Sequence, residues 1–256
     1  MNNNSKRIDF NKFENLDYDK FRQYAKREDL SGYEKVGFPD EYRKGKEELI
    51  FQDILQKLPV LSKKNQVILD IGVGCSDLPQ YLIDLCKNNN HKLILSDSPE
   101  MLSLLPDYDF IEKIPGFYPK ECKNEVEKYF GQIDGILTYS VIQYVIGHAC
   151  IFDFIDISLS LLKNGGQMLI GDIPNISKRK RFFSSETGIH FHQSFTGTDG
   201  MPVVKFNNIE TGNIDDSIVM SILSRCRTAG FDAYVLPQAD LLPMANRRED
   251  ILIIKP

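Results

Sequence analysis

The sequence predicts an α/β fold built on a mostly parallel β-sheet with helices on both faces. The apolar run Val67–Ile71 enters a turn with glycine at two alternate positions, and residues 77–85 then repeat apolar positions at helical spacing. This order of strand, turn and helix places the turn at the carboxyl end of a parallel strand. Apolar runs alternate with helical segments over residues 92–174, and a helix and two strands are expected within residues 217–254.

Length and composition describe an ordinary globular domain. The 256 residues suffice for one α/β domain or for a core with a small cap, and 42% are hydrophobic. A net charge of −5 argues against nucleic acid as a partner. The five cysteines are scattered and lack metal-ligand spacing, as expected of reduced thiols. The start of the chain is polar and no apolar run approaches bilayer length, so we expect a cytoplasmic protein with no metal and no membrane partner.

The first 45 residues are expected to form a small helical cap. They are rich in charge and tyrosine, and a short helix is plausible around Asp17–Arg27. Glycines and a proline make Ser31–Pro39 read as a loop. A long helix is predicted from Asp40 to the residue before Pro59. Residues 46–256 would then form the core.

The strand and glycine turn resemble motif I of the class I S-adenosylmethionine-dependent methyltransferases, written (D/E)-x-G-x-G-x-G. Asp70, Gly72 and Gly74 match it, and serine replaces the last glycine. A dinucleotide fingerprint would instead need glycine where the chain has Asp77, whose charge is unfavourable near a pyrophosphate. The resemblance implies S-adenosylmethionine as cofactor, with Asp70 suited to the methionine ammonium and with Val73 and both glycines beside the ligand.

A second acid lies at the end of the next predicted strand. Asp97 stands 25 positions beyond Gly72, and a carboxylate there can accept hydrogen bonds from both ribose hydroxyls. The segment that begins with Asp97 and Ser98 looks like the ribose-acid segment of small-molecule methyltransferases, which implies that both residues contact the cofactor. In the alternative interpretation, Asp97 is only the N-cap of a helix that begins near Pro99.

Further cofactor and substrate contacts are expected after the third and fourth strands. The family's adenine site follows the third strand, where this chain has Phe117, although packing in the core is an equal alternative. After the fourth strand, Ile133–Leu137, Tyr139 lies where the family contacts the cofactor and Tyr144 lies near the substrate. The (N/D)-P-P-(Y/F) element of base-modifying amino-methyltransferases is missing here, which argues against N-methylation of adenine or glutamine.

The last part of the chain completes the resemblance but contains an unmatched insertion. A helix, an L-L-K-x-G-G element and a strand ending at Asp172 match the family. Residues 175–215 lose all periodicity, and we expect a lid-like insertion whose basic run, residues 178–181, meets either a phosphate or solvent. The two C-terminal strands resemble the closing antiparallel β-hairpin of this family. The resemblance therefore implies a Rossmann-like, mostly parallel, seven-stranded sheet.

Methylation of a neutral hydroxyl would need a general base. The candidate catalytic residues are His190, His192 and Asp172, with His148 as a further candidate, and histidine is favoured because its pKa lies near neutrality. The two histidines of the insertion would point the same way if that segment were extended. Substrate contacts are expected from Tyr24, Arg43 and Tyr144, although the cap residues could simply dock the cap on the core.

The sequence therefore predicts methyl transfer to a small-molecule acceptor. O-methylation of a sugar or sugar-linked metabolite is preferred, from an overall resemblance to methyltransferases of bacterial surface-carbohydrate pathways. Three alternatives stay open: N-methylation of a small amine, an NAD(P)-dependent oxidoreductase, and a non-catalytic binding module. The identity of the acceptor and the oligomeric state are left open by the sequence.

Overall fold

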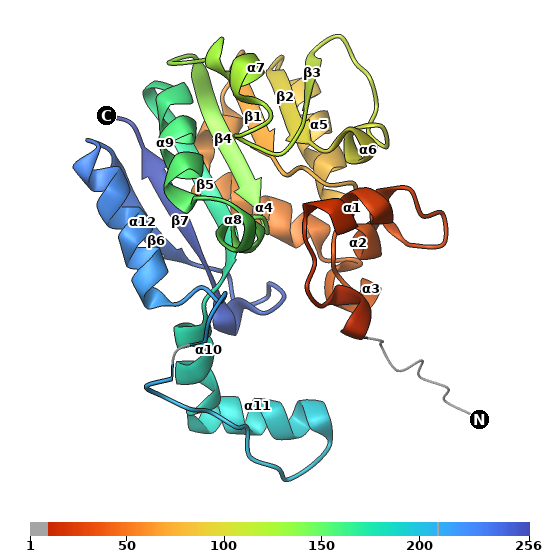
Figure 1. Ribbon diagram of the computed structural model, residues 1–256, viewed down its shortest axis with the longest axis vertical. Coiled ribbons are helices and arrows are strands. Elements are labelled where there is room, and N and C mark those ends of the chain that lie inside the picture. The colour runs from red at the N-terminus through yellow and green to blue at the C-terminus, as the bar shows by residue number, and fades with distance from the viewer. Residues whose placement is uncertain (1–9, 209) are drawn as a thin grey trace.

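The computed structural model describes residues 10–208 and 210–256 and contains one seven-stranded sheet with the strand order β3-β2-β1-β4-β5-β7-β6 (Figure 1). Strand β7 runs antiparallel to both neighbours, and the other pairs are parallel. All seven predicted strands and the closing hairpin are confirmed. The strands are β1 (Val67–Ile71), β2 (Lys92–Asp97), β3 (Ile111–Pro115), β4 (Ile133–Tyr139), β5 (Leu162–Pro174), β6 (Asp232–Pro237) and β7 (Arg248–Ile254).

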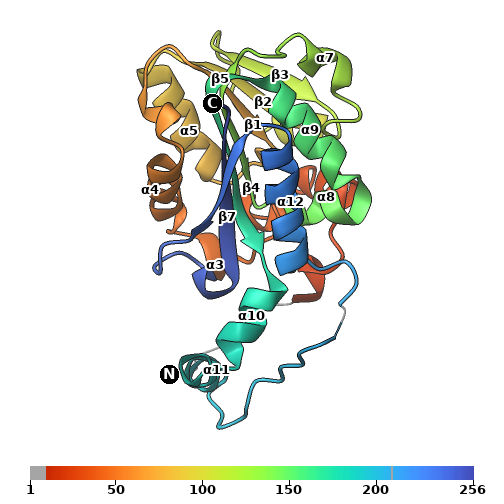
Figure 2. The same ribbon diagram turned by 90° about the vertical axis from the view of Figure 1, so that its left-hand side faces the viewer.

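Helices cover both faces of the sheet (Figure 2). On one face lie α4 (Glu47–Lys57) and α5 (Leu78–Asn88), and on the other lie α9 (Ile151–Leu161) and α12 (Asp216–Thr228). Each layer encloses its own apolar core. Within the described residues no helix is long and apolar enough to cross a membrane. The shorter helices are η1 (Phe10–Phe13), α1 (Tyr18–Ala25), α2 (Gly32–Lys35), α3 (Asp40–Arg43), η2 (Pro59–Ser62), α6 (Pro99–Leu102), α7 (Lys123–Glu127), α8 (Ile142–His148), α10 (Ile176–Phe183), α11 (Glu186–Thr196) and η3 (Ala245–Arg247).

The N-terminal segment lies at the carboxyl ends of the parallel strands (Figure 1). The predicted first helix is confirmed as α1. The segment read as a loop contains α2, because Ser31 and Glu34 form a reciprocal capping box at its start. The long helix expected from Asp40 is interrupted between α3 and α4 by Gly45, whose φ is +76°. Residues 1–9 of the expected cap, which include the polar start of the chain, lie outside the described residues.

The insertion contains a helical arm over residues 176–196, whereas the described residues from 197 to 215 are irregular, as expected. Helices α10 and α11 project beyond the carboxyl edge of the sheet, away from the core (Figures 1 and 2). Asn175 and Ser185 cap their N-termini, and these local signals were overlooked because apolar periodicity was the criterion. The basic run on α10 is largely paired inside the chain: Lys180 contacts Glu210 and Arg181 contacts Asp216. These pairs leave the phosphate interpretation without support.

Candidate functional site

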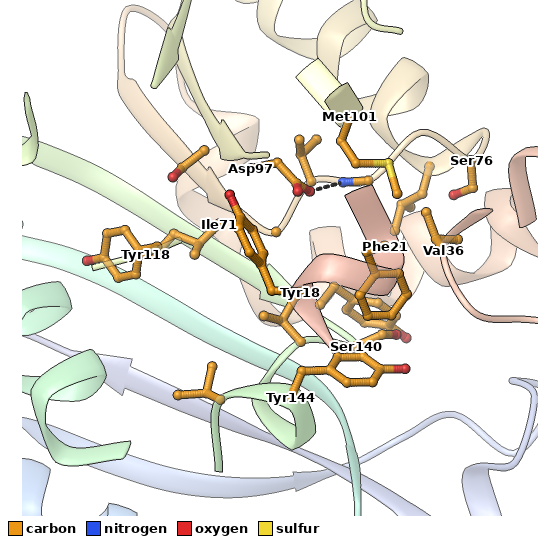
Figure 3. Close-up of a pocket in the computed structure, with 18 of the residues that line it drawn as sticks. Tyr18, Phe21, Val36, Ile71, Ser76, Asp97, Met101, Tyr118, Ser140 and Tyr144 are labelled. Carbon is orange, nitrogen blue, oxygen red and sulfur yellow. Dashed lines mark hydrogen bonds between the residues drawn. The ribbon is translucent and has the colours of Figure 1, made fainter. Parts of the chain in front are cut away.

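A pocket lies where the carboxyl ends of β3, β2, β1 and β4 meet the cap (Figure 3). Asp97, Gly72 and Ser140 line it at or directly after the ends of β2, β1 and β4. The cavity has a volume of about 140 Å³ and is open to solvent on one side. The lining residues are Tyr18, Phe21, Val36, Phe38, Arg43, Glu47, Ile71, Gly72, Val73, Gly74, Ser76, Leu78, Ser96, Asp97, Met101, Gly116, Phe117, Tyr118, Tyr139, Ser140, Val141, Tyr144, Val145 and Phe154.

The turn after β1 brings bare backbone to the pocket wall. Gly72 and Gly74 have φ values of +73° and +66°, which disfavour any residue with a side chain. A Cβ atom on Gly72 would lie 2.5 Å from Cγ2 of Val141, and one on Gly74 would lie 2.7 Å from Cγ1 of Val36. Both glycines and Val73 line the pocket as predicted. The turn therefore depends on glycine for its conformation and for the close approach of its neighbours.

Asp97 is held in the pocket by two backbone N–H groups. Gly74 N donates to Oδ2 at 2.9 Å, and Ser98 N donates to Oδ1 at 2.6 Å. Burial raises the pKa of Asp97, and these two hydrogen bonds oppose that shift. Each carboxylate oxygen keeps a further acceptor site. The N-cap of α6 is Ser98 and not Asp97; Ser98 is fully buried and does not line the pocket.

Asp70 does not line the pocket, in contrast to the expectation from motif I. Side chains alternate along a strand, so Asp70 shares a face with Ile68, opposite Leu69 and Ile71. That face packs against α5, where Asp70 lies close enough to Cys86 to affect its pKa. Burial, followed by the nearby charge of Asp97, raises the pKa of Asp70 to about 8. Glu47 is the additional carboxyl group that does line the pocket.

The cap places aromatic rings over the pocket. Tyr18 and Phe21 on α1 point into it (Figure 3), and the ring of Tyr18 meets that of Phe117 edge-on at 5.1 Å between centroids. Tyr24 is on another side of α1, where its hydroxyl donates to the carbonyl of Lys12, and it does not line the pocket. The pocket therefore gives no support to a substrate contact by Tyr24, and Tyr18 is a lining residue that sequence reasoning missed.

Arg43 of the cap and residues at the end of β4 contribute polar side chains to the pocket. Arg43 and Tyr144 line it as expected, and Tyr139 also contributes. Nη2 of Arg43 donates to Oδ2 of Asp172 at 2.8 Å and to Oγ of Ser140 at 2.5 Å. Asp172 itself does not line the pocket and lies behind Ser140, whose hydroxyl donates to it at 2.5 Å. The substrate-binding roles of Arg43 and Tyr144 stay predictions.

The predicted histidine bases are not brought to this pocket. His190 and His192 lie on α11 in the arm, where a two-residue separation directs side chains to different sides of a helix, so the extended arrangement was wrong. His192 packs edge-on against Phe183 at 6.2 Å. His148 lines a neighbouring cavity. Among the described residues no histidine lines the pocket, and no group of three or more acidic, histidine or cysteine side chains could hold a metal ion.

No protein-family model matches the sequence, and no curated protein matches it significantly. Solved structures do match. N-methyltransferase NodS from Bradyrhizobium japonicum, in complex with S-adenosylhomocysteine, is 14% identical with a TM-score of 0.55 over 93% of this chain and 98% of its own. A SAM-dependent methyltransferase from Aquifex aeolicus is 13% identical with a TM-score of 0.52 over 88% of this chain and 97% of its own. The plantazolicin methyltransferase BpumL, in complex with a monoazolic desmethylPZN analog and S-adenosylhomocysteine, is 13% identical with a TM-score of 0.52 over 84% of this chain and 86% of its own.

The chain has the class I methyltransferase fold. The antiparallel strand β7, inserted between β5 and β6, distinguishes this methyltransferase fold from a plain dinucleotide-binding sheet. The fold therefore gives no support to the oxidoreductase alternative.

Proposed function

We propose that the protein is an S-adenosylmethionine-dependent methyltransferase that acts on a small molecule. The observation that carries this proposal is Asp97, fixed by two N–H groups at the end of β2 with one acceptor site left on each oxygen. That arrangement suits the two adjacent hydroxyls of a ribose. Phe117 would contact the adenine, and the backbone around Gly72 would contact the methionine part. A scaffold without a ligand has no use for a carboxylate held in this way.

The bound cofactor would supply an electrophilic methyl group on sulfur. The chain would orient the acceptor and keep water out, and the aromatic rings of Phe21, Phe38 and Tyr144 line the pocket for that purpose. O-methylation of a sugar or sugar-linked metabolite would need a base. Asp172 is the one predicted base near the pocket, and the hydroxyl of Ser140, which lines the pocket, donates a hydrogen bond to it. N-methylation of a small amine is the second candidate, because it needs no base and histidine is missing from the lining.

Asp97→Ala is expected to weaken the binding of S-adenosylhomocysteine about 100-fold, because two hydrogen bonds to a carboxylate are lost. Titration calorimetry on the wild type and the variant measures this. Asp97→Asn, which keeps one acceptor oxygen, should lose about tenfold. Asp109→Ala is the control, since Asp109 is exposed on the loop before β3. Well-folded wild-type protein that binds no S-adenosylhomocysteine would refute the proposed function.

A partly exposed ion pair between α1 and α6 attaches the cap to the core beside the pocket. Arg22 of α1 donates from Nε and Nη2 to both oxygens of Glu100 at 2.9 and 3.0 Å, and Lys26 adds a contact at 3.0 Å. The bond from Arg22, followed by that from Lys26, lowers the pKa of Glu100 to about 2. Glu100 begins α6 only three residues after Asp97, so this contact joins the cap to the cofactor side of the pocket.

Glu100→Gln is therefore expected to speed the release of S-adenosylhomocysteine about two- to fivefold, a modest effect because the pair is partly exposed. Release of the labelled compound into an excess of unlabelled compound measures the rate. Glu125→Gln, an exposed position on α7, serves as the control. An unchanged rate in Glu100→Gln would show that this ion pair does not hold the cap.

A further inference from the structure

Two non-glycine residues with left-handed backbone lie side by side at the edge of the pocket. Ser140 has φ +62° at the end of β4, and Asp172 has φ +59° within the end of β5. Such conformations are strained for a residue with a side chain and are found at functional sites. Asp172 is fixed on both sides, since its N–H donates to Oδ1 of Asp250 at 2.8 Å and its carbonyl accepts from Nη1 of Arg248 at 3.0 Å.

Ser140 and Asp172 both accept a hydrogen bond from the guanidinium of Arg43. Both contacts of Nη2 go to Ser140 and Asp172, and the guanidinium lies 4.1 Å from the ring centroid of Phe38. Arg43 is 5% exposed, and its Nε is buried without a hydrogen-bond partner among the described residues. A buried N–H without a partner is unfavourable. Arg43 lines the pocket, and both hydrogen bonds of its guanidinium come from Nη2, so Nη1 can donate to a ligand oxygen.

The position of Arg43 across the sheet favours the acceptor over the cofactor. Asp97 and Gly72 belong to β2 and β1, whereas Asp172 belongs to β5, on the far side of β4. Rings of Phe21, Phe38 and Tyr144 line this part of the pocket (Figure 3 shows Phe21 and Tyr144). No lysine or second arginine is among the lining residues. The hydrogen bond that a guanidinium N–H forms most strongly is to a carboxylate.

We propose that Arg43 binds a carboxylate of the methyl acceptor, and that Asp172 and Ser140 position Arg43 for this. The inference rests on the proposed function and narrows it: the acceptor is a small carboxylic acid, such as a sugar acid. The methionine part of the cofactor also has a carboxylate, so the experiment must separate the two sources.

Protein saturated with S-adenosylhomocysteine is titrated with two matched pairs, glucuronate against glucose and benzoate against benzamide. We expect the wild type to prefer at least one carboxylate over its neutral partner by about tenfold or more, and Arg43→Gln to lose that preference. Arg43→Lys should lose it too, because lysine keeps the charge but lacks the planar fork of N–H donors that contacts Asp172, Ser140 and a ligand together. S-adenosylhomocysteine affinity within about threefold of wild type shows that these variants are folded and that the cofactor site is intact.

Asp172→Asn tests the positioning role. It should weaken carboxylate binding and leave the affinity for S-adenosylhomocysteine unchanged, which a general loss of structure would not do. The proposal is overturned if the loaded wild type prefers neither carboxylate, or if Arg43→Gln keeps the preference. It is also overturned if Arg43→Gln loses S-adenosylhomocysteine but retains 5′-methylthioadenosine, which lacks the amino-acid part. Wild type that binds no S-adenosylhomocysteine would instead refute the proposed function.

Discussion

Asp70→Asn is expected to stabilise the protein at pH 8 and to flatten its stability profile between pH 4 and pH 8. Burial raises the pKa of Asp70 from 3.8 to about 8. Between these two values the unfolded chain has lost a proton that the folded protein retains, so the free energy of unfolding falls as the pH rises. The free energy of unfolding falls by about 1.4 kcal/mol per pH unit between the two pKa values, which amounts to several kcal/mol between pH 4 and pH 8. Asparagine carries no charge and removes this contribution.

Urea unfolding at pH 5 and pH 8 measures the difference for the wild type and the variant. Asp109→Asn, at an exposed position, is the control and should keep the wild-type profile. Other buried acids, such as Asp97 and Glu47, also have raised pKa values, so a smaller slope of the same sign will remain. Equal slopes in Asp70→Asn and wild type would contradict the prediction. Because Asp70 does not line the pocket, the variant should bind S-adenosylhomocysteine like the wild type.

The sheet could be predicted from the sequence because its signals are local and strong. Buried strands such as Val67–Ile71 are mostly apolar, and each is followed by a turn or by a helix with apolar positions at a period of 3.6. The same reasoning found Asp97, because an acid at the end of a parallel strand lies at the ligand edge wherever its neighbours are. These features depend on the order of elements and not on side-chain packing.

The sequence was a poorer guide to residues whose role depends on the direction in which the side chain points. Asp70 was assigned to the pocket from its place in a motif, although the alternation of Leu69 and Ile71 in β1 directs it to the opposite face. On α1 the predicted substrate contact is Tyr24, whereas Tyr18 is the tyrosine that lines the pocket. His190 and the rest of the arm failed for a different reason, since α11 packs little against the core and keeps Phe195 69% exposed. An exposed helix shows no apolar stripe to detect.

Asp250→Ala is expected to destabilise the protein by about 3 kcal/mol or more, because it breaks a buried ion pair and leaves polar groups without partners. Asp250 is fully buried on β7. Its Oδ2 accepts from Nζ of Lys57 at 2.6 Å, and its Oδ1 accepts from the N–H of Asp172 and from Nε2 of Gln238. The single carboxylate therefore joins α4, β5 and β6–β7 below the polar end of the pocket.

Thermal unfolding measures the effect, and for a chain of this size a loss of that magnitude lowers Tm by about 6–12 °C. Asp250→Asn separates the two contributions: it keeps an oxygen for the N–H of Asp172 but gives up the charge opposite Lys57, so it should lie between alanine and wild type. Asp240→Ala, on the exposed loop after β6, should change Tm by no more than about 2 °C. If Asp250→Ala has the same Tm as the wild type, the ion pair between Lys57 and Asp53, at 2.5 Å, is sufficient to stabilise the buried charge of Lys57. The left-handed backbone of Asp172 would then need no support from β7.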